Sequence, residues 1–137
     1  MNPDQPARTA NHGVACIKSR YPFADTVTHL LATLRQHGIK VFATIDQQAE
    51  AAQAGLAMPP ATLILFGNPK AGTPLMLARP AAGIDLPLKV FISEAAPGEV
   101  TVMFHSAAYL MDRHGLPAEL SANIASAERL IAAAAGA

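Results

Sequence analysis

Hydrophobic and polar residues follow two different periods along the chain, and each period predicts a different kind of element. Apolar residues between Ala24 and Leu34 recur at helical spacing with polar residues between them, which predicts an amphipathic helix ending at His37-Gly38. Five short runs are β-branched or alternate between apolar and polar residues, as strands do. They are Val14–Arg20, Lys40–Asp46, Thr62–Phe66, Leu86–Ser93 and Val100–His105.

The spacing of these runs predicts how the strands pair. The last two runs are separated by the turn-forming residues 94–99, so we expect an antiparallel hairpin. The continuous apolar run Thr62–Phe66 is typical of a central strand covered on both faces. Strands are grouped late in the chain instead of alternating with helices, which disfavours a doubly wound sheet. We therefore predict an α+β fold, with a mostly antiparallel sheet and helices packed on one face.

Further helices are expected after the first one. Asp46 is placed to cap a short helix over residues 47–54, and Ala107–His114 forms another helix. A longer helix is expected from about residue 117, and its apolar face is formed by Leu120, Ile124, Ala127 and Ile131. Residues 1–13 are mostly polar and are predicted to form a flexible leader, so that residues 14–137 make a single domain.

Composition and charge narrow the classes of function. Of the 137 residues, 51% are hydrophobic and 15% are charged, which is a globular composition. Ten basic and ten acidic residues balance without clustering, so we expect no nucleic-acid partner and no membrane-surface helix. No apolar run is long enough to span a membrane and no secretory signal is recognised, so we expect a cytoplasmic protein.

The segment 67–73, Gly-Asn-Pro-Lys-Ala-Gly-Thr, is the most distinctive candidate site. We expect it to be a loop between a strand and a helical turn over residues 74–78, with Thr73 as the N-cap and Pro74 as the first helical residue. Glycines, helix-start amides and a lysine together favour an anion site, although the P-loop order is absent. An ordered turn also explains these residues. The candidate ligand-binding residues of the segment are Gly67, Asn68, Lys70, Gly72 and Thr73.

Two more candidates lie outside this segment. Asp85 would either orient Lys70 or hold a cation, or it would serve as a turn residue bonded to its own backbone. His105 shares one strand face with Met103, and this surface suits a ligand groove or a dimer interface. The histidines lack metal-ligand spacing and the single cysteine, Cys16, is expected to be a small buried hydrophobe, so we expect no metal and no cofactor.

Three segments resemble the domain-of-unknown-function family 302. They are residues 38–46 (Gly-Ile-Lys-Val-Phe-Ala-Thr-Ile-Asp), 66–76 (Phe-Gly-Asn-Pro-Lys-Ala-Gly-Thr-Pro-Leu-Met) and 85–89 (Asp-Leu-Pro-Leu-Lys), and the resemblance runs from about residue 14 to residue 114. It implies a fold like that of the TATA-box-binding-protein class, in the order β-α-β-β-β-β-α, commonly assembled as a homodimer. It implies no activity and no catalytic residues. The expected helix beyond residue 117 lies outside the resembling region.

Three functional hypotheses remain open at this point. The first is a non-catalytic, homodimeric domain that binds a small molecule, anionic or amphipathic, near segment 67–73. The second is a small enzyme that uses Lys70 and Asp85 in acid–base chemistry. The third is a structural or partner-binding protein whose sheet face and C-terminal helix are interfaces.

Overall fold

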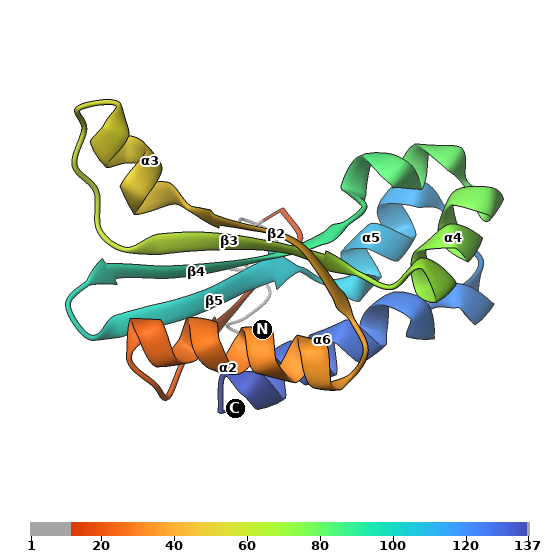
Figure 1. Ribbon diagram of the computed structural model, residues 1–137. Helices are drawn as coiled ribbons and strands as arrows, with labels where there is room; N and C mark the ends of the chain where they lie inside the picture. Colours follow the sequence, from red (N-terminus) through yellow and green to blue (C-terminus); the bar gives the residue numbers. More distant parts are fainter. Residues whose placement is uncertain (1–11, 137) are drawn as a thin grey trace, which may run out of the picture.

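A single five-stranded sheet forms the centre of the molecule (Figure 1). The computed structural model describes residues 12–136. The strands are β1 (Val14–Lys18), β2 (Lys40–Asp46), β3 (Ala61–Gly67), β4 (Leu88–Ala96) and β5 (Glu99–His105). Their order across the sheet is β1-β5-β4-β3-β2, and every neighbouring pair is antiparallel. The predicted antiparallel sheet and its β4–β5 hairpin are therefore confirmed.

Two helices cover one face of the sheet. Helix α2 (Phe23–Gln36) and helix α6 (Ala122–Ala134) pack against each other below the strands in Figure 1. The main core lies between these helices and the sheet, because the apolar stripe of each helix meets the apolar strand face. Its largest buried side chains come from both layers, and they are Leu30, Leu34, Ile64, Phe66, Val90, Ile92, Val102 and Ile131.

The remaining helices lie at the two ends of the sheet. Helix α3 (Gln47–Gln53) is capped by Asp46 as expected, and it projects at the left end in Figure 1. At the right end are three elements that share a smaller core with α6. These are helix α4 (Pro69–Ala78), the 3-10 helix η1 (Pro80–Asp85) and helix α5 (Ala107–His114). A 3-10 turn, η2 (Ala118–Leu120), leads into α6.

Two predictions about β3 and the segment after it are wrong. β3 is an interior strand, but only one of its faces is fully buried, since Leu63 and Leu65 remain half-buried on the face away from α2 and α6. The run is continuously apolar because both faces carry apolar side chains, not because helices cover both. Helix α4 begins at Pro69, so most of the expected loop 67–73 is helical and Pro74 lies inside the helix.

The expected leader falls mostly outside the described residues. Residues 1–11 lie outside the described part of the chain, and nothing about them follows from the fold. Gly13 is described, and its carbonyl accepts a hydrogen bond of 2.9 Å from the Ser106 amide. Gly13 has a φ of +86°, and a Cβ there would overlap the Tyr109 ring. This close approach explains why glycine stands directly before β1.

Candidate functional site

A cavity of about 530 Å³ lies at the right end of the sheet, where α4 and α6 meet the strands. Its walls come from the segment between α2 and β2, the start of β2, the end of β3, the first two turns of α4, residues 86–88 and the facing side of α6. The sequence folds in this way because β3 leads directly into α4, which then packs on α6. The most distinctive segment of the sequence therefore forms one wall of this cavity.

The lining of this cavity is mainly apolar. Apolar side chains from each wall face it, among them Ile39, Phe42, Phe66, Leu75, Leu86 and Leu130. The polar lining residues are His37, Asn68, Thr73, Asn123 and Ser126. An apolar lining with few polar groups is typical of sites for small organic molecules.

Asn68 is the N-cap of helix α4 and accepts hydrogen bonds from the backbone amides of its first turn. Its side-chain Oδ1 accepts a hydrogen bond of 3.0 Å from the Lys70 amide. Its carbonyl accepts bonds of 2.8 Å from both the Ala71 and the Gly72 amides. Pro69 has no N–H to offer. The first-turn donors that would hold an anion are thus already bonded within the chain, and Asn68, not Thr73, is the N-cap.

Ala71 connects α4 to the α6 wall of the cavity, and Gly72 lies beside it on the lining. The Asn123 side chain donates a 2.9 Å hydrogen bond from Nδ2 to the Ala71 carbonyl, which links α6 to α4. Gly72 lines the cavity, and a Cβ there would lie 3.8 Å from the Leu86 side chain, an ordinary van der Waals distance. A larger side chain at position 72 would therefore extend into free space inside the cavity.

Lys70 lies outside the cavity lining. Its side chain is exposed on α4, and within residues 12–136 it forms no ion pair. Asp85, its expected partner, is occupied elsewhere. The structure therefore does not bring Lys70 and Asp85 together, because the helical backbone of α4 turns Lys70 away from the cavity wall.

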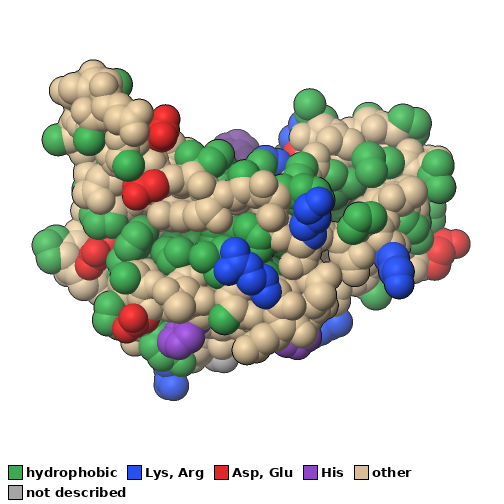
Figure 2. Space-filling model, viewed as in Figure 1, with side chains coloured by type: hydrophobic (Ala, Val, Ile, Leu, Met, Phe, Trp, Pro, Cys, Tyr) green, Lys and Arg blue, Asp and Glu red, His purple; other side chains and the backbone are tan. Residues whose placement is uncertain are grey.

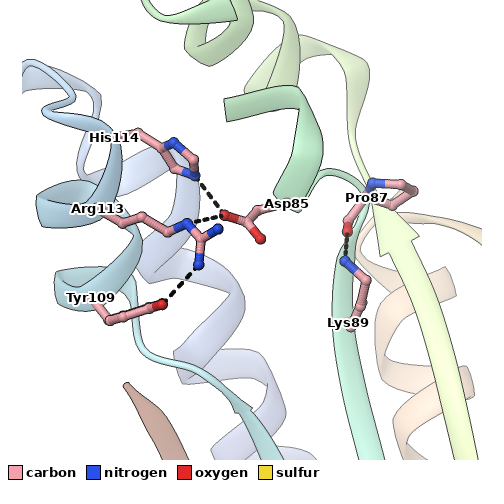
Figure 3. Close-up of polar contacts among 6 residues, drawn as sticks. All are labelled: Asp85, Pro87, Lys89, Tyr109, Arg113 and His114. Carbon is pink, nitrogen blue, oxygen red and sulfur yellow. Dashed lines mark hydrogen bonds and ion pairs between the residues drawn. The ribbon is translucent and has the colours of Figure 1, made fainter. Parts of the chain in front are cut away.

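Asp85 holds η1 against helix α5 (Figure 3). Its Oδ2 accepts a hydrogen bond of 2.5 Å from His114 Nε2 and lies 3.3 Å from Arg113 Nε. Arg113 also donates a 3.0 Å bond to the Tyr109 hydroxyl. The Tyr109 hydroxyl and then the Asp85 carboxylate raise the pKa of Arg113, so its guanidinium stays charged. The Asp85 carboxylate thus contacts His114 and Arg113, and not its own backbone or Lys70 as the two expectations had it.

His105 lies beside this cluster. Its ring stacks on Tyr109, with 5.5 Å between ring centres and an interplanar angle of 25°. His105 and Asp85 both line a second hollow of about 20 Å³, together with Lys89 and Glu128. A hollow of that volume holds about one water molecule, so it is too small for an organic ligand.

The candidate residues therefore lie in three places. Four of them line the large cavity: Gly67, Asn68, Gly72 and Thr73. Asp85 and His105 line the small hollow, and Lys70 lies on the surface. Cys16 is exposed on β1, so the expectation that it is buried is wrong. β1 is an edge strand, and the sheet face on which Cys16 lies is not covered there. Among residues 12–136, no group of three or more His, Cys, Asp or Glu side chains is placed to hold a metal ion.

Several lining residues were not identified from the sequence. Phe42, Leu86 and Asn123 lie far apart along the chain, and strand pairing and helix packing bring them together. Phe42 had one local signal, because two adjacent bulky residues, Val41 and Phe42, break the alternation of β2. The register of β2 against β3 shifts at this point, which is a β-bulge. The other residues carry no signal that a single sequence reveals.

This geometry defines the protein as an α+β domain with a cavity of about 530 Å³ beside its sheet. Residues 15–134 match the family described as Domain of unknown function DUF302, and the chain belongs to that family. The match includes α6, so the expectation that the C-terminal helix lies outside the family region is wrong.

A solved structure from the same family has a similar fold. It is an uncharacterized conserved DUF302 protein from Bacillus stearothermophilus, with a TM-score of 0.75 and 18% sequence identity. The likeness covers 90% of this chain and 96% of that one. The α+β class is thereby confirmed, and the more specific likeness to the TATA-box-binding-protein class stays a prediction.

Curated relatives from Brucella are longer proteins. The chain is 36% identical over 110 residues to proteins named Fluoride-specific ion channel FluC 1 from Brucella suis biovar 1 and from Brucella abortus biovar 1. The matched region is 80% of this chain but only 43% and 41% of those proteins, so the chain spans about two fifths of their length. Within residues 12–136 we find no helix with the length and apolar character needed to cross a membrane.

Proposed function

We propose that this chain is a non-catalytic binding domain that holds a small, mainly apolar molecule in the cavity beside α4. The observation that carries the proposal is the cavity itself, whose volume of about 530 Å³ falls within the range of roughly 300–1,000 Å³ usual for small-ligand sites. Apolar walls favour a hydrocarbon or aromatic ligand, because burial of apolar surface drives its binding.

The arrangement of polar groups supports binding over catalysis. The enzyme hypothesis needs Lys70 and Asp85 in one site, whereas Lys70 is exposed and Asp85 bonds to His114 and Arg113. The amides of the first turn of α4 are occupied by Asn68, which leaves a free phosphate-like anion without backbone donors there. The proposed ligand therefore has an apolar body, and any charged group would be bound at the cavity edge.

The homodimer and the cytoplasmic location belong to the same proposal. The sheet face away from α2 and α6 carries half-buried apolar side chains on three neighbouring strands, and we name it the open sheet face. They are Leu63, Leu65, Phe91 and Met103. A second copy of the chain covering this face would remove these side chains from water. The third hypothesis, a partner-binding protein, rests on the same surface.

Calorimetric titration with 1-octanol tests the cavity as the binding site. We expect saturable binding to the native chain and at least about a tenfold loss of affinity in Gly72→Leu, because the new side chain fills the cavity. Ala52→Leu adds the same side chain to the exposed surface of α3 and serves as the matched control. Lys70→Ala should bind as the native chain does. Equal affinity in Gly72→Leu and Ala52→Leu would show that the cavity is not the site.

A further inference from the structure

Lys40 and Phe42 place a positive charge at the edge of the cavity. Phe42 lines the cavity, is 47% exposed, and packs against Gly67 so closely that a Cβ there would lie 3.3 Å from its ring. The Lys40 ammonium lies 5.1 Å from the centre of the Phe42 ring. Lys40 also pairs directly with Gly67 across β2 and β3. The ammonium therefore lies beside a lining residue, and the Lys40 side chain is exposed to solvent.

Among residues 12–136, no acidic side chain offsets this charge at the cavity. Among the described residues, none of those lining the cavity is Asp or Glu. Lys40 has no carboxylate within ion-pair distance in the described range 12–136. In Figure 2, most Lys and Arg side chains lie over the middle and right of this view, whereas most of the acidic ones lie at the left. The edge of the cavity therefore favours a negative group over a positive one.

The β-bulge in β2 accounts for this arrangement. Phe42 is the extra residue between Val41 and Ala43, and its ring lies against Gly67. The Lys40 ammonium lies over this ring in a cation–π contact. An aromatic ring with a cation over it presents both an apolar wall and a charge to the same ligand.

We infer that the ligand is an amphiphilic carboxylate, with its hydrocarbon part in the cavity and its carboxylate at the edge beside Lys40. The inference rests on the proposed function and adds the chemical class of the ligand. The carboxylate would bind at Lys40 and not at the start of α4, because Asn68 already bonds the amides there. An ammonium and a carboxylate form a charge-assisted hydrogen bond, which a neutral amphiphile lacks and a cationic one replaces with repulsion.

The test compares three probes that share an eight-carbon chain and differ in the head group. Octanoate, 1-octanol and octyltrimethylammonium are titrated below their micelle concentrations against the native chain and Lys40→Gln. We expect Lys40→Gln to weaken octanoate roughly three- to tenfold, to leave 1-octanol unchanged and to strengthen octyltrimethylammonium. Lys18→Gln removes the same charge from an exposed position on β1 and should change none of the three.

The outcomes separate the ligand class from the proposed function. If Lys40→Gln changes all three probes alike, or none of them, the carboxylate inference is overturned while the cavity remains a binding site. If 1-octanol binds and octanoate does not, the inference is overturned in the same way. If no probe binds the native chain, or Gly72→Leu binds all three unchanged, the proposed function and the inference both fail.

Discussion

Asn68 illustrates how single residues determine the chemistry of the cavity wall. Its side chain and its carbonyl together accept three hydrogen bonds from the first turn of α4. The sequence motif alone favoured Thr73 as the cap, since threonine before proline is a common helix start. Asn68-Pro69 is an equally good start, and it begins the helix five residues earlier. The difference matters for function, because a helix that starts at Pro69 turns Lys70 outward.

The two alternative N-caps, Asn68 and Thr73, predict different losses of stability on substitution by alanine. We expect Asn68→Ala to lower the free energy of unfolding by about 1 kcal/mol, the usual cost of a lost N-cap. Thr73→Ala should change it by less than about 0.5 kcal/mol, because Thr73 is an exposed residue inside the helix. Urea denaturation of both variants measures the difference. A larger loss in Thr73→Ala than in Asn68→Ala would contradict the observed start of α4.

At the scale of elements, hydrophobic periodicity correctly predicted the helices and strands whose ends are determined by nearby residues. The helix ending at His37-Gly38, the β4–β5 hairpin and the cap of α3 by Asp46 are all confirmed. Gly38 has a φ of +71°, which explains why glycine ends that helix. The bulge at Phe42 and the half-buried face of β3 were missed, since both depend on how strands pair and on which face a helix covers.

The open sheet face is the element that bears on assembly. Phe91 and Met103 are directly paired across β4 and β5, and Leu63 pairs with Phe91 from β3, so these apolar side chains form a row across three strands. Helices α2 and α6 cover the opposite face and leave this row uncovered. A dimer formed through this row would bury it.

Light scattering after size exclusion tests the dimer. We expect the native chain to have twice the mass of one chain, and Phe91→Glu to have the mass of one, because a carboxylate at the centre of the row opposes burial. Thr28→Glu adds the same charge on the exposed side of α2 and should stay dimeric. A native chain with the mass of a monomer at all concentrations would contradict the dimer, and a dimeric Phe91→Glu would contradict this interface.

At the scale of the whole molecule, the cavity depends on segments that meet only in the folded chain. Segment 67–73 was recognised from its composition, and it does form one wall. Phe42 comes from β2, Leu86 directly follows η1 and Asn123 comes from α6, and no spacing rule joins residues so far apart. Asp85 was expected to face Lys70 or to bond its own backbone, but packing of η1 on α5 places it at the small hollow, which His105 also lines.

The central claim is that the cavity beside α4 binds the apolar part of a small ligand. The most direct measurement is a titration of the ¹⁵N-labelled protein with octanoate, followed residue by residue in amide correlation spectra. We predict that the largest shifts occur at lining residues from different walls, such as Gly67, Gly72 and Ser126. Shifts concentrated on the open sheet face, at Leu63, Phe91 and Met103, or an absence of shifts at the lining residues, would contradict the claim.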